Sequence, residues 1–206
     1  MARPLRIEYP DALYHVMSRG NACKNIYLND NDRIGFLSNL KHCIKLHNVI
    51  CHAYCLMNNH YHLLLETPDG NLSQVMRDIN GNYTQSFNVL HKRVGHLFQG
   101  RYRAEIIEKE TYLIEVMRYV VLNPVRAKLT ANPKDWKWSS YRATVGQVEA
   151  PVWLDTDWTL DFFSKNKKEA RKHYKEFIFA GIGAGSPFDD IQEGVILGSP
   201  QFIHWI

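Results

Sequence analysis

Two histidines separated by one residue are the first feature of this sequence with the spacing of metal ligands. They lie in the segment His60-Tyr61-His62, within a run of apolar residues that favours a β-strand. Side chains alternate along a strand, so His60 and His62 would point to one face, about 7 Å apart at the backbone, and could share a divalent ion. On a helix the same spacing would turn the two side chains about 200° apart. The alternative interpretation is a pair of ordinary half-buried histidines beside a polar turn.

A second candidate group lies on a predicted helix over residues 110–122. Tyr119 and Asn123 are four residues apart, so they share one side of the helix, separate from its apolar stripe. A tyrosine hydroxyl can attack a phosphodiester and form a covalent phosphotyrosine. The alternative interpretations are that Tyr119 is packed at the edge of the core and that Asn123 is a helix-ending residue ahead of Pro124.

Together the two groups suggest one reaction on a phosphodiester. A divalent ion held by His60 and His62 would polarise the phosphate as a Lewis acid, and Tyr119 would attack the phosphorus. The amide oxygen of Asn123 would complete the metal site. Imidazole and amide ligands bind Mg²⁺ or Mn²⁺ weakly, so we expect the substrate phosphate to help hold the ion.

The four cysteines raise the alternative of a structural zinc protein. Cys51, Cys55 and the nearby His52 follow no tetrahedral spacing, and Cys23 and Cys43 form no CxxC pair. Cysteine is also among the most buried residue types. We therefore interpret them as reduced thiols of a cytoplasmic protein, in keeping with the absence of a secretory signal at the N-terminus.

The hydrophobic pattern predicts the elements that position these groups. It indicates strands at 12–18, 49–57, 60–67 and 102–108, with a tight turn at 58–59 between the second and the third. Helices are expected from the caps at 29–32 to residue 47, over 72–90, and over 110–122, where Pro124 ends the last one. This order predicts an α+β fold, a ferredoxin-like or RRM-like βαββαβ antiparallel sheet with its helices on one face.

Length and charge divide the chain into two parts. The 206 residues carry a net charge of +4, but residues 1–147 hold 19 basic and 12 acidic side chains, whereas residues 148–206 hold 6 and 9. We expect a catalytic domain over 1–147 and a C-terminal extension of unknown role over 148–206, with a helix at 165–179 and a flexible break at 181–187. A basic body suits a nucleic-acid partner. No apolar run is long enough for a membrane span, so no membrane partner is expected.

Six segments of the sequence resemble the REP-associated tyrosine transposases, a branch of the single-tyrosine HUH transposases related to those of small insertion sequences. The resemblance covers about residues 2–146. The segments that carry it are Arg3-Pro4-Leu5-Arg6-Ile7, Tyr14-His15-Val16-Met17-Ser18-Arg19-Gly20-Asn21, the run from Ala53 to Leu65, Phe98-Gln99-Gly100-Arg101-Tyr102, the run from Tyr119 to Ala127, and Trp136-Lys137-Trp138-Ser139-Ser140-Tyr141.

The resemblance implies a specific role for each candidate residue. His60 and His62 match the two histidines of the HUH motif, Tyr119 matches the nucleophilic tyrosine, and Asn123 matches the third metal ligand. In that family the tyrosine cleaves single-stranded DNA beside a palindromic hairpin, keeps the 5′-phosphate and frees a 3′-OH. The metal would be Mg²⁺ or Mn²⁺. The alternative is a domesticated relative that binds hairpin DNA or RNA without cutting it.

Basic side chains near these segments are candidates for phosphate contacts. Each could equally be a solvated surface charge. We expect the protein to work as a monomer, with a dimer as the alternative. The candidate DNA-binding residues are Arg19, Arg77, Arg101, Arg103, Arg118 and Arg126.

Overall fold

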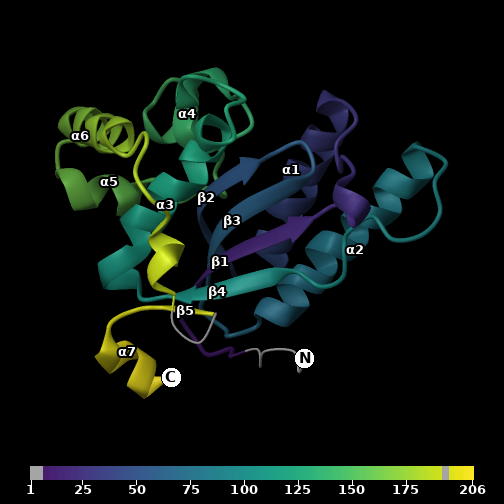
Figure 1. Ribbon diagram of the computed structural model, residues 1–206, viewed down its shortest axis with the longest axis horizontal. Coiled ribbons are helices and arrows are strands. Elements are labelled where there is room, and N and C mark those ends of the chain that lie inside the picture. Colours follow the sequence, from purple (N-terminus) through teal and green to yellow (C-terminus); the bar gives the residue numbers. More distant parts are fainter. Residues whose placement is uncertain (1–6, 192–194) are drawn as a thin grey trace.

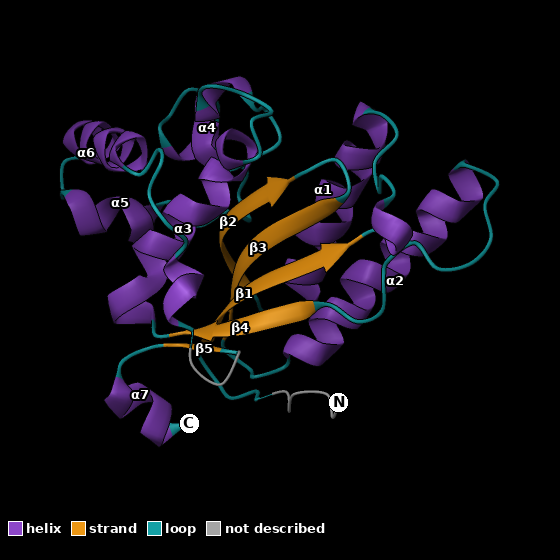
Figure 2. Cartoon of the chain, viewed as in Figure 1, coloured by secondary structure: helices purple, strands orange, loops and turns teal. Residues whose placement is uncertain are grey.

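The computed structural model describes residues 7–191 and 195–206, in which a central sheet is enclosed by helices (Figures 1 and 2). The elements are β1 (Ala12–Arg19), η1 (Asn21–Cys23), α1 (Asp30–Leu46), β2 (Ile50–Leu56), β3 (His60–Thr67), α2 (Leu72–Leu90), β4 (Arg103–Ile107), α3 (Lys109–Arg126), η2 (Pro133–Asp135), α4 (Tyr141–Thr144), α5 (Asp157–Phe163), α6 (Lys167–Ala180), η3 (Pro187–Asp190), β5 (Ile196–Leu197) and α7 (Pro200–Trp205).

The sheet confirms the predicted α+β fold and extends it by one strand. Its order is β2-β3-β1-β4-β5, with β1 antiparallel to both β3 and β4. The short strand β5 pairs with β4 in parallel, through Ile106 with Ile196 and Ile107 with Leu197. The sheet is therefore mixed rather than antiparallel, because the C-terminal segment returns to cover the edge of β4.

Helices cover both faces of the sheet, so the prediction of helices on one face is wrong. Helices α1 and α2 pack on one face, against Tyr14, Val16 and Leu63 among other residues. Helix α3 packs on the opposite face, against Leu13 and Leu64. In Figure 1 it lies on the other side of the sheet from α1 and α2. Strands β1 and β3 have buried side chains at nearly every position, and a strand that is apolar on both sides needs a cover on both sides.

Helix α3 runs past Pro124 to Arg126 instead of ending before the proline. Pro124 has no N–H to donate, which would leave the carbonyl of Val120 unpaired one turn earlier. The side-chain amide of Asn123 lies 3.5 Å from that carbonyl and donates more closely, at 3.0 Å, to the carbonyl of Tyr119. A side-chain donor thus takes over part of the backbone bonding, and the helix continues for one more turn.

Other predicted boundaries agree closely with the structure. Strand β3 and helix α2 have the expected bounds, and α1 begins with a capping box between Asn29 and Asp32. The predicted helix at 165–179 is α6, whereas the short elements α4, α5, β5 and α7 were not expected.

The C-terminal segment shares its core with the rest of the chain. Leu160, Tyr174 and Ile178 are buried in the same cluster as Val116 and Val120 of α3. Side chains from residues before and after 147 therefore fill one core. The predicted domain boundary near residue 147 stays a prediction. Among the described residues, no helix combines the length and the apolar character needed to cross a membrane.

Candidate active site

His60 and His62 lie on one face of β3, as the alternation along a strand predicts. Their ring centroids are 5.0 Å apart with the planes at 80°. His62 is 3% exposed and His60 is half-buried. Burial lowers the pKa of both imidazoles, with a further contribution from Arg19 at His60 and from His15 at His62. Both rings are therefore neutral at neutral pH, the form that carries a lone pair on one ring nitrogen.

Tyr119 projects from α3 onto the same face of the sheet. Its ring centroid lies 5.9 Å from that of His62, with the planes at 86°. The side chain is half-buried, and burial raises the pKa of the phenol above its ordinary value. The nearby charge of Arg126 opposes that rise. Two segments 57 residues apart in the sequence thus meet at a tyrosine beside a histidine pair.

Asn123 lies one turn beyond Tyr119 on α3 and is 9% exposed. Its Nδ2 donates to the Tyr119 carbonyl at 3.0 Å, which assigns the nitrogen to the helix backbone. The Oδ1 atom is consequently the atom left for a ligand. Pro124 supports this orientation, because it has no N–H and leaves the carbonyl of Val120 available to the same amide nitrogen, at 3.5 Å.

The donor set fits a weakly held divalent ion. The Nε2 atom of His62 is buried and has no hydrogen-bond partner among the described residues. An unpaired buried acceptor is costly, and an ion would satisfy it. In residues 7–191 and 195–206, no three His, Cys, Asp or Glu side chains are grouped to hold a metal. The candidate ligands would therefore be the two imidazoles and the Asn123 oxygen, and an ion held by them would need further ligands from water or substrate.

Two residues of this site were missed in the sequence: His15 on β1 and Glu105 on β4. The Nδ1 of His15 lies 2.8 Å from Oε2 of Glu105, and its Nε2 lies 2.8 Å from Nδ1 of His62. Both residues are buried, each 4% exposed. The available signal was a polar residue between two buried or half-buried neighbours in each strand, both on the face that carries His62.

Phe188 of the C-terminal segment lies against the same group. Its ring stacks on His15 at 4.7 Å and meets the Tyr119 ring edge-on at 5.1 Å. Residues 184 and 185 of the predicted flexible break accept hydrogen bonds from Arg126 through their carbonyls, at 2.8 and 3.1 Å. The C-terminal segment is therefore part of the surroundings of Tyr119.

Three of the predicted arginines surround the histidine–tyrosine group. Arg19 is exposed and stands opposite His60 in the register of β1 with β3. Arg103 is exposed on β4 and forms an ion pair with Glu105. Arg126 lies over the Tyr119 ring, 5.1 Å from its centroid.

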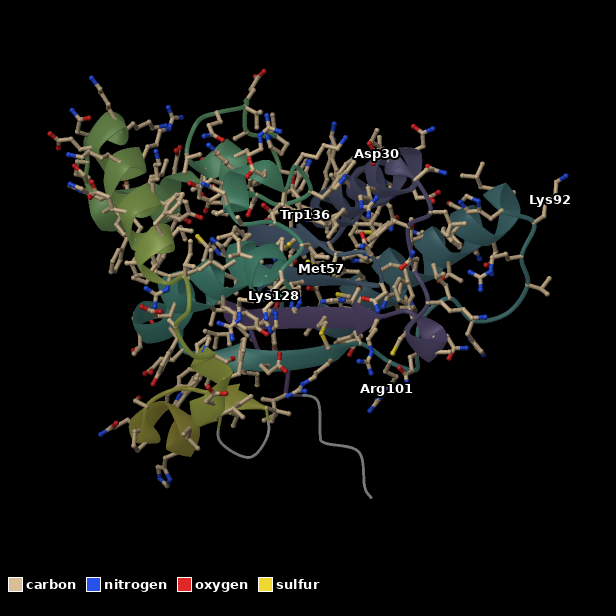
Figure 3. The ribbon with its side chains drawn as sticks, turned by 45° about the horizontal axis from the view of Figure 1, so that its top comes forward. Asp30, Met57, Lys92, Arg101, Lys128 and Trp136 are labelled. Carbon is tan, nitrogen blue, oxygen red and sulfur yellow. The ribbon has the colours of Figure 1, made fainter. Side chains whose placement is uncertain are left out.

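The other three arginines have different surroundings. Arg101 lies in the loop before β4 with its side chain directed outward (Figure 3). Arg118 borders a cavity of about 250 Å³ with Tyr119, but it pairs with Glu115 and packs 4.3 Å from the ring centroid of Phe177. Arg77 pairs with Asp78 on α2, which covers the face of the sheet opposite Tyr119.

The cysteines have the environment of core residues. Cys43, Cys51 and Cys55 are buried, and only Cys23 is exposed. Burial raises the pKa of the Cys51 and Cys55 thiols, which disfavours the thiolate form that zinc requires. Their surroundings therefore favour packing over zinc binding.

Comparison with known families agrees with this geometry. The family model described as "Transposase IS200 like" matches residues 8–123, which contain both histidines, Tyr119 and Asn123. The chain belongs to the IS200-like transposase family. Processing of DNA in the manner of a transposase is the function that this family membership supports.

Solved structures show a shared fold at low sequence identity. A REP-associated tyrosine transposase bound to a REP hairpin matches with a TM-score of 0.61 and 16% identity, over 76% of this chain and 93% of that one. A candidate transposase from Deinococcus radiodurans matches with a TM-score of 0.41 and 15% identity, over 58% of this chain and 95% of that one, too low a score to define a common fold. No curated protein matches the sequence.

Proposed function

We propose that this IS200-like transposase cleaves and rejoins single-stranded DNA at hairpin-forming palindromic repeats, with Tyr119 as the nucleophile. The observation that carries the proposal is the Tyr119 ring 5.9 Å from the His62 ring, with Asn123 one turn further along α3. Family membership supports DNA processing. The hairpin bound by the REP-associated relative supports the choice of substrate class.

The reaction is a transfer of a phosphoryl group to the phenol. The Tyr119 oxygen forms a bond to phosphorus as the bond to the 3′ oxygen breaks, which leaves a 5′-phosphotyrosine. The phenolic proton leaves to solvent, and the departing 3′ oxygen takes up a proton to give a free 3′-OH. Rejoining is the reverse, with a 3′-OH attacking the phosphotyrosine and regenerating the phenol.

His60, His62 and Asn123 would hold a divalent ion beside this phosphate. Bound there, Mg²⁺ or Mn²⁺ supplies Lewis-acid polarisation of the phosphodiester. The imidazole nitrogens and the amide oxygen are neutral, so affinity depends on the charge of the substrate phosphate. Mn²⁺ accepts imidazole ligands more readily than Mg²⁺ and is the better ion for a first experiment.

The arginines near Tyr119 are the proposed phosphate contacts. Arg19, Arg103 and Arg126 border the histidine–tyrosine group, and Arg101 extends from the adjoining loop. Arg118 and Arg77 are proposed as weaker contributors. Arg118 pairs with Glu115 and packs on Phe177, and Arg77 lies on the far face of the sheet.

A tyrosine substitution tests the proposal. Tyr119→Phe removes only the hydroxyl, so we expect unchanged folding and hairpin binding but no covalent adduct with a hairpin oligonucleotide in Mn²⁺ on a denaturing gel. Tyr112→Phe, two turns earlier on α3 and also half-buried, is the matched control and should form the adduct. An adduct formed by the Tyr119→Phe variant would show that Tyr119 is not the nucleophile.

One observation favours the second candidate function, a protein that binds hairpins without cutting them. Phe188 lies against both His15 and Tyr119, so part of the site is covered by the chain itself. Hairpin binding that is insensitive to chelator, with no cleavage by the wild-type protein in Mn²⁺, would support that function over the first.

A further inference from the structure

A chain of hydrogen bonds crosses three strands and ends at the buried nitrogen of His62. Glu105 on β4 bonds His15 on β1, and His15 bonds His62 on β3, each at 2.8 Å. The two imidazole rings are nearly parallel, with 12° between their planes. Beyond His62 Nδ1, the remaining ring atom able to bond is Nε2, which is buried and unpartnered within the described part of the chain.

The direction of these bonds follows from which atoms can donate. An ionised carboxylate only accepts, and Arg103 donates to the other oxygen of Glu105. His15 therefore donates from Nδ1–H, and a neutral ring then has only a lone pair at Nε2. With His15 neutral, that lone pair accepts from His62 Nδ1–H, so the remaining lone pair of His62 lies on Nε2.

An independent contact gives His60 the same arrangement. Asn59 donates from Nδ2 to the carbonyl of Cys23 at 3.0 Å, which places its Oδ1 toward His60. The Nδ1 of His60 lies 2.7 Å from that oxygen and must be the donor, which leaves the lone pair on Nε2. Two separate networks thus select the same tautomer for both histidines of the pair.

We propose that Glu105 and His15 are positioning residues that hold His62 in the Nδ1–H tautomer, so that its Nε2 is ready to bind a divalent cation. The inference rests on the metal-binding role proposed above for His62. Hydrogen bonds from ligand histidines to carboxylates commonly orient the ring and strengthen the ligand. Here a second imidazole is inserted between the carboxylate and the ligand, and Phe188 packs on that imidazole.

The chain contains a matched pair that serves as a control. His52 on β2 is 1% exposed and bonds Glu66 on β3 at 2.8 Å, so it is also a buried histidine joined to a carboxylate across two strands. Within the described residues it has no hydrogen bond or ion pair with His60 or His62. Loss of His52 should reduce stability as loss of His15 does, without affecting the metal site.

The first experiment uses the metal-free wild-type protein. Long-range ¹H–¹⁵N correlation spectra of the histidine rings report which nitrogen of each ring carries the proton. We expect the Nδ1–H form for both His60 and His62, and a mixture of forms for His62 in His15→Leu. A wild-type His62 protonated on Nε2 would overturn the proposal without any substitution.

The second experiment measures Mn²⁺ binding by titration calorimetry, with the protein alone and with a hairpin oligonucleotide bound. We expect His15→Leu to weaken binding about 10- to 100-fold, the usual range for loss of such an outer partner, and Glu105→Gln to weaken it less. His15→Gln should retain most of the affinity, because an amide can accept from His62 and donate to Glu105. His52→Leu should bind as the wild type does, and thermal unfolding shows which variants are folded.

The outcomes separate this inference from the proposed cleavage. Equal Mn²⁺ affinity in wild type and folded His15→Leu would overturn the inference and leave cleavage by Tyr119 intact. Binding that depends on His15 in a protein that forms no adduct would support the inference and count against cleavage. Absence of Mn²⁺ binding by the wild type, both alone and with a hairpin oligonucleotide bound, would overturn the inference together with the metal role of His62.

Discussion

The guanidinium of Arg126 lies 5.1 Å from the centroid of the Tyr119 ring. Burial raises the pKa of Tyr119, and Arg126 opposes the rise. As the phenol loses its proton during attack, the oxygen becomes negative, and a cation beside it stabilises that charge more than it stabilises the neutral phenol. We therefore expect Arg126 to assist the proposed attack by Tyr119, in addition to any phosphate contact.

Replacement of Arg126 should slow cleavage even when DNA is saturating. We expect Arg126→Gln to lower the rate of adduct formation about two- to fivefold, the range for an exposed ion pair, because the developing phenolate loses a nearby cation. Arg126→Lys should retain most of the rate. The measurement is single-turnover cleavage of a hairpin oligonucleotide in Mn²⁺.

The matched control for this prediction is Arg77→Gln on α2, where the arginine lies on the face of the sheet opposite Tyr119. That variant should cleave at the wild-type rate once DNA saturates it. Identical rates for Arg126→Gln and Arg77→Gln would show that Arg126 does not contribute to the reaction.

Residues close together in sequence were predictable, whereas partners across strands were not. The placement of His60 with His62, and of Tyr119 with Asn123, follows from the repeat of one strand and of one helix. The contact of His15 with His62 depends instead on the register of β1 with β3. Register is set by the packed sheet as a whole, so no local pattern in the sequence points from one of these residues to the other.

Among the elements, β3 and α3 are joined at the end remote from His60 by one ion pair. Glu66, near the end of β3, accepts from Lys109 Nζ at 2.6 and 2.7 Å and from His52 at 2.8 Å. Lys109 is the first residue of α3. This contact helps to fix the start of the helix that carries Tyr119 relative to the strand that carries the histidines.

The Glu66 contact predicts a dependence of stability on pH. Burial alone would raise the pKa of Glu66, but hydrogen bonds from His52 and Lys109 outweigh it and hold the pKa below its ordinary value. A carboxyl with a lowered pKa stabilises the fold above the pKa of the unfolded chain, about 4.3, and loses that contribution as the pH falls through the folded value. Glu66→Gln should therefore reduce the free energy of unfolding at pH 7 by roughly 1–2 kcal/mol.

Urea unfolding of wild type and Glu66→Gln at pH 7 and at pH 3.5 to 4 checks this expectation. The difference between the two proteins should shrink at the lower pH. Glu149→Gln, in an exposed loop, is the control and should match the wild type at both values. A difference that stays constant with pH would mean that the ionised form of Glu66 adds nothing to stability.

At the scale of elements, the sequence predicted the helices and strands that have a strong hydrophobic periodicity. It did not predict helix ends and short strands that depend on tertiary packing. The bounds of β3 and α2 follow from their apolar repeats. Pro124 is a helix-ending signal on its own, but the Asn123 amide bonds within the helix and the helix passes through it. The two-residue strand β5 carries no periodicity and exists because the edge of β4 was open to pair.

Over the whole molecule, the basic and the acidic parts of the chain pack together around Tyr119. Residues 148–206 have more acidic than basic side chains, yet they supply Phe188 against His15 and the carbonyls of residues 184 and 185 to Arg126. The same segment adds β5 to the sheet next to β4, the strand that carries Glu105. The extension is thus built into the surroundings of the site as well as into the core.

The histidine pair and Tyr119 come from a single chain, and the link between β4 and the helix that carries Tyr119 is short. Only Glu108 separates the end of β4 from the start of α3. A one-residue link, with the Glu66–Lys109 ion pair beside it, holds α3 against its own sheet and leaves no length for α3 to reach a second copy. The histidine pair and Tyr119 thus meet within one chain, in keeping with the expectation of a monomer.

Mixing two inactive variants tests whether the site is built within one chain. Tyr119→Phe lacks the nucleophile and keeps the histidines, whereas His60→Ala lacks a proposed ligand and keeps the tyrosine. If each chain builds its own site, an equal mixture should form no more adduct with a hairpin oligonucleotide in Mn²⁺ than either variant alone, and light scattering should give the mass of one chain. Adduct formation restored by mixing would mean instead that α3 of one copy serves the histidines of another, and that the one-residue link at Glu108 rearranges in the active form.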